Sequence, residues 1–401
     1  MKTPWELLKE SKTKIKTTWR IAFVSALVLG LLIHLPVMLS DIPNHDGLSS
    51  MYFDQNMITS GRWFLTVACG FSSYFTIPWV IGLIGLIWLA LTAAVLTEVL
   101  ELTDPVTITV VSGLLVSFPA LASTFAYVFT MDGYMMALFL VVLAVLFTAK
   151  YPRGYLAGAV CLAFSMGIYQ AYLPFTILLC VYKILLYFME EKGWKEKAKY
   201  LCRYLGMGIA GGVLYYVILQ ILLKLQGKVL DTYQGINSME QMGSSMGILA
   251  TIKGMYVDFL AFTVHGNVLV NNIFSLVACI ILVATVVFLV IRSMIWRKWW
   301  KNPAFFVIMI LLGISMPLLT NVILLISPNL TYHLLMRYQW VLYLILMTAF
   351  ADRYTAEESR TDVVLQWAAL CAAVVLVFDY GISDNIGYSN LEKKYEKTYA
   401  Y

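Results

Sequence analysis

Residues 21–39 read IAFVSALVLGLLIHLPVML, a run that contains no Asp, Glu, Lys or Arg. A helix needs about 20 such residues to cross the roughly 30 Å hydrocarbon core of a bilayer, so this run is long enough to span one. A basic leader of 20 residues precedes it, and Leu39-Ser40-Asp41-Ile42-Pro43 follows in place of a small-residue cleavage site. This arrangement predicts a retained first transmembrane helix and not a removed signal peptide.

The composition extends this interpretation to the whole chain. Of the 401 residues, 61% are hydrophobic and 13% are charged, against roughly 45–50% and 25% in ordinary globular proteins. A large soluble domain is therefore excluded. The net charge of +5 comes from basic residues scattered between apolar runs, which favours a loop charge bias over nucleic-acid binding. The six cysteines lie mostly in or beside apolar runs without paired spacing, so they indicate small core residues and no disulfide framework or metal site.

The apolar runs predict an all-α polytopic membrane protein with about eleven transmembrane helices. We expect a basic leader over 1–20, one transmembrane domain over 21–379 and a tail over 380–401. The predicted spans are 21–39, 77–97, 106–123, 132–149, 155–170, 172–189, 204–223, 268–291, 304–327, 334–351 and 363–379.

Lysine and arginine set the predicted orientation. The leader carries six of them, and alternation of the spans places 19 of the 28 on the same side. Because cytoplasmic loops carry this excess, we expect the N-terminus in the cytoplasm. An odd number of spans then leaves the C-terminal tail outside the cytoplasmic membrane. The long outer segments become 40–76, 224–267 and the tail from 380.

The range 248–264 is apolar enough to be considered as a twelfth span. Lys253 and Asp258 would then both lie in hydrocarbon, and the charge alternation after it would be broken. We therefore interpret this range as an outer interfacial helix and keep eleven spans.

The first outer segment holds the most informative polar residues. From 46 to 61 the pattern is helical, and Leu48, Met51, Tyr52, Gln55 and Ile58 share one stripe. Asp46 is a good N-cap, Asp54 is on the polar side, and Arg62 follows at the helix end. A capped surface helix alone explains each residue singly. Together they favour an amphipathic juxtamembrane helix that presents carboxylates to a lipid headgroup.

Three further outer positions carry candidate polar side chains. Asp132 precedes the fourth span, where it is a candidate site residue or an N-cap. Gln170 lies in the connection between the fifth and sixth spans, among aromatic residues typical of an interfacial belt. Arg337 lies just inside the tenth span, where the alternatives are an anion partner and snorkelling to the interface.

Several short strings at these positions resemble the membrane glucosyltransferases of the serotype-converting Gtr type II. The resemblance covers most of the chain, from the first span to the tail. Its strings are Asn44-His45-Asp46, Asp54-Gln55-Asn56-Met57, Gly61-Arg62-Trp63-Phe64, Thr130-Met131-Asp132-Gly133-Tyr134, Gly167-Ile168-Tyr169-Gln170-Ala171-Tyr172 and Asp384-Asn385-Ile386-Gly387-Tyr388.

This resemblance implies a GT-C architecture and a sugar donor carried on an undecaprenyl-type phosphate. It also implies transfer, on the outer side of the cytoplasmic membrane, onto a surface polysaccharide or cell-wall polymer. Members often have two adjacent acids where this chain has His45-Asp46, which favours Asp46. The candidate catalytic residues are thus Asp46, Asp54 and Asp132, and the candidate substrate-binding residues are Arg62, Tyr169, Gln170 and Arg337.

The chemistry of such a transfer requires few groups. A carboxylate near the bilayer surface suits the removal of a proton from the acceptor hydroxyl. A fixed cation must stabilise the leaving phosphate, and Arg62 and Arg337 are outer-side arginines that suit this role. No Gly-rich element for a nucleotide is seen. Two ways to stabilise charge stay open, a divalent cation held by the three aspartates and the arginine pair acting without metal.

Two rival classes remain at this stage. A secondary transporter or lipid flippase should carry ionisable residues near the bilayer midplane and internal repeats. Most span centres lack Asp, Glu and Arg, and the sequence shows no convincing internal repeat. A polysaccharide polymerase should concentrate arginine in a large late outer loop, but 224–267 contains no arginine, and its basic residues are Lys224 at the helix end, Lys228 and Lys253. An acyltransferase needs a histidine base in a membrane cavity, for which His34 is the candidate.

Overall fold

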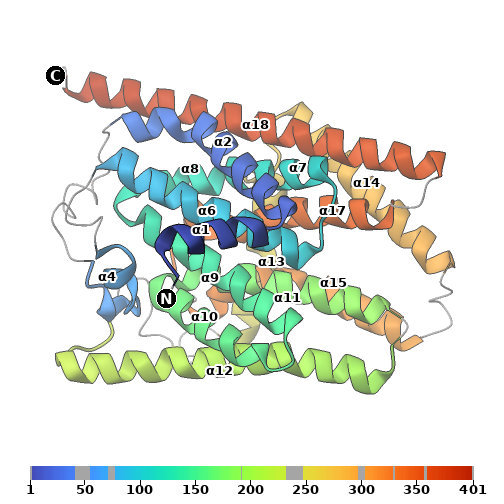
Figure 1. Ribbon diagram of the computed structural model, residues 1–401, viewed down its shortest axis with the longest axis horizontal. Coiled ribbons are helices and arrows are strands. Elements are labelled where there is room, and N and C mark those ends of the chain that lie inside the picture. Colours follow the sequence, from blue (N-terminus) through green and yellow to red (C-terminus); the bar gives the residue numbers. More distant parts are fainter. Residues whose placement is uncertain are drawn as a thin grey trace.

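The computed structural model describes residues 2–40, 55–70, 77–190, 192–231, 247–296, 303–327, 330–355 and 359–399. Within these ranges the chain is a bundle of helices, and its one extended pairing is an isolated antiparallel bridge between Met57 and Arg62. Two long helices flank the bundle in Figure 1, α18 (Arg360–Tyr399) along one side and α12 (Trp194–Gln226) along the other. The predicted all-α polytopic class is confirmed.

The helices follow the apolar runs of the sequence. Before α12 they are α1 (Pro4–Lys14), α2 (Thr17–Leu39), η1 (Ile58–Ser60), α4 (Leu65–Ala68), α6 (Pro78–Leu100), α7 (Pro105–Ser117), α8 (Pro119–Phe125), η2 (Val128–Thr130), α9 (Met131–Lys150), α10 (Gly154–Ile168), η3 (Gln170–Tyr172) and α11 (Leu173–Met189). After α12 they are α13 (Ile248–His265), α14 (Ile273–Trp296), α15 (Pro303–Thr320), α16 (Val322–Ile326), η6 (Leu334–Trp340), α17 (Val341–Tyr354) and α18.

Each of the eleven predicted spans falls on helix, but not all of these helices are long. Among the described residues, nine helices are long and apolar enough to cross a membrane, and the bent pair of α7 and α8 makes a tenth. The helices α10 and Phe306–Thr320 are apolar but shorter. The nine include α13, which the sequence places on the outer interface. The count of eleven spans therefore stays a prediction.

The third predicted span is broken at Ser117-Phe118-Pro119, where α7 and α8 meet at an angle of 46°. Proline has no N–H to donate to the carbonyl four residues earlier, so the Leu115 carbonyl loses its helical partner. The hydroxyl of Tyr338 donates to that carbonyl instead. His34 Nε2 bonds to the carbonyl of Val116 at 2.8 Å. Side chains of η6 and α2 thus satisfy the carbonyls that the break exposes.

Glu98, near the end of α6, joins two basic residues that the sequence assigns to the cytoplasmic side. Its carboxylate accepts from Lys16 Nζ at 2.6 Å and from Lys150 Nζ at 2.9 Å. Lys16 lies in the leader, directly before α2, and Lys150 ends α9. These two residues therefore lie at the same end of the bundle, as the alternation of spans requires.

Glu101, in the turn between α6 and α7, forms a second ionic cluster at this end. It pairs with Lys183 at 2.6 Å and with Arg353 at 2.8 Å. Burial raises the pKa of the Glu101 carboxyl, but the hydrogen bonds and charges of Lys183 and then Arg353 outweigh burial and hold it below its usual value. The buried Lys183 ammonium also donates to the Val99 carbonyl at 3.0 Å, so it is paired within the protein.

The predicted orientation is testable with two exposed lysines. In a variant whose six natural cysteines are replaced, Lys195→Cys and Lys394→Cys each add a single thiol. A membrane-impermeant maleimide applied to intact cells is expected to label position 394 and not position 195, because the basic loops are predicted to face the cytoplasm. Both positions should react after the cells are lysed. The reverse pattern in intact cells would invert the topology.

Candidate active site

Two of the three candidate carboxylates, Asp46 and Asp54, lie outside the described residues. The described part of the predicted amphipathic helix, 55–61, is not α-helical. Gln55 has a φ of 54°, and η1 is a single 3-10 turn that ends at Gly61 with a φ of 75°. The amide of Arg62 then bonds back to the Met57 carbonyl at 3.1 Å. This left-handed turn directs the chain into Arg62, so the α-helix predicted over 46–61 does not reach its predicted end.

Arg62 is held by two tyrosines from different helices. Its guanidinium donates to the hydroxyl of Tyr134 at 3.1 Å and lies over the ring of Tyr169, 5.0 Å from the ring centre. The two rings are stacked, with centres 4.1 Å apart and planes 10° from parallel. Tyr134 is in the first turns of α9, and Tyr169 ends α10. The guanidinium therefore has a fixed position on an aromatic platform.

Gln170 fixes the turn that precedes Arg62. Its amide nitrogen donates to the Ser60 carbonyl at 3.1 Å and to the Tyr215 hydroxyl at 3.0 Å. Tyr215, from α12, donates in turn to the Gly61 carbonyl at 3.1 Å. Three separate segments thus meet at the turn. The structure brings together three predicted site residues, Arg62, Tyr169 and Gln170.

Asp132 lies beside this group, in the first turn of α9, and its side chain is buried. Its Oδ1 accepts the amide of Gly133 at 2.9 Å. Gly133 allows α4 to approach, because a Cβ atom there would lie 2.3 Å from Cys69 Sγ. Asp132 is therefore buried where α9 packs against α4. Among the described residues, no group of three or more His, Cys, Asp or Glu is placed to hold a metal ion.

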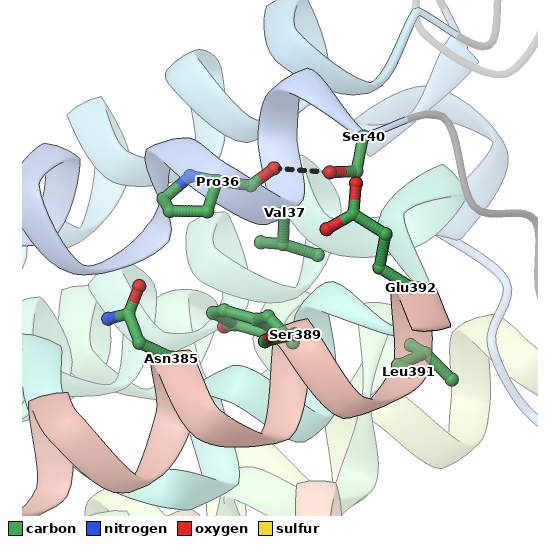
Figure 2. Close-up of a pocket in the computed structure, with 8 residues that line it drawn as sticks. Pro36, Val37, Ser40, Asn385, Ser389, Leu391 and Glu392 are labelled. Carbon is green, nitrogen blue, oxygen red and sulfur yellow. Dashed lines mark hydrogen bonds between the residues drawn. The ribbon is translucent and has the colours of Figure 1, made fainter. Parts of the chain in front are cut away.

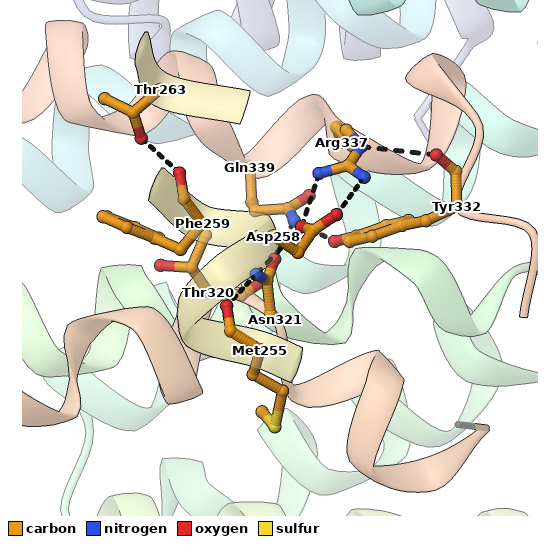
Figure 3. A network of polar contacts seen from close by, with 9 residues as sticks. All are labelled: Met255, Asp258, Phe259, Thr263, Thr320, Asn321, Tyr332, Arg337 and Gln339. Carbon is orange, nitrogen blue, oxygen red and sulfur yellow. Dashed lines mark hydrogen bonds and ion pairs between the residues drawn. The ribbon is translucent and has the colours of Figure 1, made fainter. Parts of the chain in front are cut away.

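Arg337 lies in a second polar group (Figure 3). Its two terminal nitrogens bond to the two carboxylate oxygens of Asp258 at 2.8 and 2.7 Å, a bidentate pair. Its Nε donates to the Tyr332 carbonyl at 3.3 Å, and its guanidinium lies 3.9 Å from the centre of the Tyr332 ring. The backbone of Arg337 leaves helical geometry inside η6 (φ −104°, ψ 22°). This kink accompanies the turn of the side chain toward α13.

Two amides complete the group around Asp258. Asn321, between α15 and α16, donates to Asp258 at 3.1 Å and to the Met255 carbonyl at 2.9 Å. Gln339 donates to the Tyr332 hydroxyl at 2.6 Å. Asp258 is thus a polar-site residue that our sequence reasoning did not select. The available signal was a lone acid in an apolar run, and pairing with Arg337 compensates its charge.

Aromatic rings connect the two arginine groups. Tyr169 lies 5.4 Å from Tyr172, and Tyr172 lies 6.4 Å from Tyr338, between ring centres. Tyr338 follows Arg337 in η6. A row of tyrosines therefore links the two predicted arginines, which make no direct contact with each other in the described structure.

Comparison with known proteins identifies a protein family. The family model described as "Glucosyl transferase GtrII" matches residues 35–351, which include all seven candidate site residues. No curated protein and no solved structure matches the chain.

Proposed function

Because the chain belongs to the glucosyl transferase GtrII family, we propose that it transfers glucose from a polyprenyl-phosphate donor to a surface polysaccharide or cell-wall polymer. The reaction takes place at the outer face of the cytoplasmic membrane. The observation that carries the proposal is the family match over most of the bundle. The grouping of Arg62, Tyr169 and Gln170 from distant parts of the chain supports it.

The proposed transfer is an inverting displacement. An acceptor hydroxyl attacks the anomeric carbon, and the bond from that carbon to the phosphate oxygen breaks. The proton of the hydroxyl passes to Asp46, and the bonding electrons leave with the polyprenyl phosphate. Asp54 and Asp132 are the other carboxylates of the site. Asp132 is buried where α9 packs against α4, so its role is to position neighbouring groups or to serve a substrate that enters there.

Arg62 is the first candidate for the cation that stabilises the leaving phosphate. Phosphate receives two parallel hydrogen bonds from a guanidinium, which makes fixed orientation valuable. Tyr134 and Tyr169 supply that orientation. Arg337 is the second candidate. Its two terminal nitrogens already bond to Asp258, so a phosphate there must share or replace that carboxylate.

The proposed function is tested with purified protein in liposomes. Polyprenyl-phosphate glucose is supplied as donor with the isolated surface polysaccharide of the host cell, and the product is analysed by mass spectrometry. We expect a mass increase of one hexose per transfer. A nucleotide-activated glucose in place of the lipid donor should give no product. If only the nucleotide sugar supports transfer, the assignment of a lipid donor is wrong. If neither donor supports transfer, the proposed function is wrong.

The role of Arg62 is tested in the same assay. Arg62→Lys keeps the charge but loses the fork, so we expect the donor KM to rise about tenfold, within the range of one charged hydrogen bond. Arg62→Ala should be worse. Lys228→Ala, an exposed outer cation, is the matched control. Wild-type donor kinetics in Arg62→Lys would assign Arg62 to interfacial anchoring, where lysine substitutes well.

A further inference from the structure

A cavity of about 160 Å³ lies between the end of α2 and the last turns of α18 (Figure 2). Its walls come from two distant parts of the chain. They are Pro36, Val37 and Ser40 of the α2 end, and Asn385, Tyr388, Ser389, Leu391 and Glu392 of α18. Figure 1 places this part of α18 and α4, which follows Arg62, toward the same end of the bundle. None of these residues belongs to the arginine groups described above.

The polar atoms of the cavity are mainly acceptors. Asn385 uses its amide nitrogen on the carbonyls of Ile33 (3.1 Å) and Gly381 (2.8 Å), which leaves its oxygen to accept from a ligand. Ser40 donates its hydroxyl to the Pro36 carbonyl at 2.8 Å, so its lone pairs remain. Glu392 adds a carboxylate. This set suits a ligand that donates several hydroxyl groups.

No lysine or arginine lines the cavity among the described residues. A phosphate bound there would meet a carboxylate and no fixed cation, which is unfavourable. The cavity therefore suits an uncharged sugar and not the phosphate of a lipid donor.

Tyr388 gives the cavity one rigid aromatic wall. Its hydroxyl shares a 2.7 Å hydrogen bond with His34 Nδ1, while His34 Nε2 bonds to the Val116 carbonyl. In a neutral imidazole the second nitrogen is then an acceptor, so Tyr388 is the donor. His34 is also stacked on Phe125, with ring centres 4.5 Å apart. An apolar ring held beside convergent polar groups is the usual composition of a small-molecule site.

We propose that this α2–α18 cavity binds a sugar unit of the acceptor polysaccharide. The inference rests on the proposed function and adds a separate place for the acceptor. Ser40 is six residues before Asp46 in the sequence, and six residues reach at most about 20 Å. The chain between them is thus short enough to keep the proposed base within about 20 Å of Ser40. In this proposal the arginines bind the donor phosphate, and the neutral and acidic oxygens of the cavity bind the acceptor sugar.

The kinetic test uses two substitutions in the cavity and one outside it. Ser389→Leu fills the cavity, and Glu392→Gln removes its charge. With isolated host polysaccharide as acceptor, both should raise the acceptor KM about tenfold and leave the donor KM unchanged. Glu396→Gln, an exposed acid one turn farther along α18, should change neither. An unchanged acceptor KM in Ser389→Leu overturns the proposal, and so does a rise confined to the donor KM.

A second measurement needs no transfer reaction. In the cysteine-replaced variant, Ser389→Cys and Glu396→Cys are labelled with a maleimide in the presence and absence of the polysaccharide. We expect the polysaccharide to slow labelling at 389 severalfold and to leave 396 unchanged. Protection at 389 without any glucose transfer would support sugar binding in the cavity and overturn the proposed function. Equal labelling rates at 389 with and without polysaccharide would overturn sugar binding in the cavity, whatever the transfer assay gives.

Discussion

Replacement of Asp46 by asparagine is expected to reduce glucosyl transfer by about 100-fold or more, which is the scale of losing a general base. Asparagine keeps the size of the side chain and can still cap a helix, but it cannot accept the proton of the acceptor hydroxyl. The measurement is kcat with saturating lipid donor and polysaccharide in liposomes. Asp46→Glu, which keeps the carboxylate and displaces it, should recover part of the rate.

Substitutions of the other two candidate carboxylates, Asp54 and Asp132, serve as controls for this result. Asp54→Asn should reduce transfer less than Asp46→Asn if Asp46 alone takes the proton. Asp132→Asn should also affect folding, because this side chain is buried where α9 packs against α4. Yield and elution profile in detergent separate a folding defect from a catalytic one. Near-normal turnover in Asp46→Asn would transfer the role of base to Asp54 or Asp132.

The positions of most helices were predictable from sequence because a helix that crosses the bilayer needs an apolar run of about 20 residues. The apolar runs do not show how a broken helix is stabilised. Pro119 lies at the break in the third span, but the side chains that bond to the carbonyls of Leu115 and Val116 come from η6 and α2, which are distant in sequence. The interfacial assignment of α13 stays a prediction. It rested partly on the charges of Lys253 and Asp258, and the sequence did not show that Asp258 pairs with Arg337.

Arg62, Tyr169 and Gln170 were selected from two outer segments far apart in the sequence, and the structure brings them together. Tyr134 was inside a quoted string but was not selected, because phenols are common at interfaces and nothing marked it as the partner of Arg62. Tyr215 carried no signal, since it lies within the apolar run of α12. Partner choice between helices is set by tertiary packing, which spacing along one helix does not reveal.

Removal of the Arg337 side chain is expected to lower both stability and donor use. The Arg337 side chain is 9% exposed and that of Asp258 is 26% exposed. Breaking a buried pair of this kind destabilises by roughly 3–5 kcal/mol when one charge is left unpaired, and the partial exposure of Asp258 favours the lower end. Arg337→Ala should therefore show a clear loss of thermal stability in detergent. Arg337→Lys should lose less, because the charge stays and the fork is lost.

Stability alone does not distinguish a structural pair from a phosphate site. The double variant Arg337→Gln with Asp258→Asn distinguishes them. Both charges are removed together, so neither is left unpaired, and stability should return to within about 1 kcal/mol of the wild type. If Arg337 also stabilises the donor phosphate, the donor KM of the stable double variant stays raised, because asparagine and glutamine supply no positive charge. Wild-type donor kinetics in the double variant would make the pair purely structural. Arg62 would then be left, of the two arginines, as the cation for the phosphate.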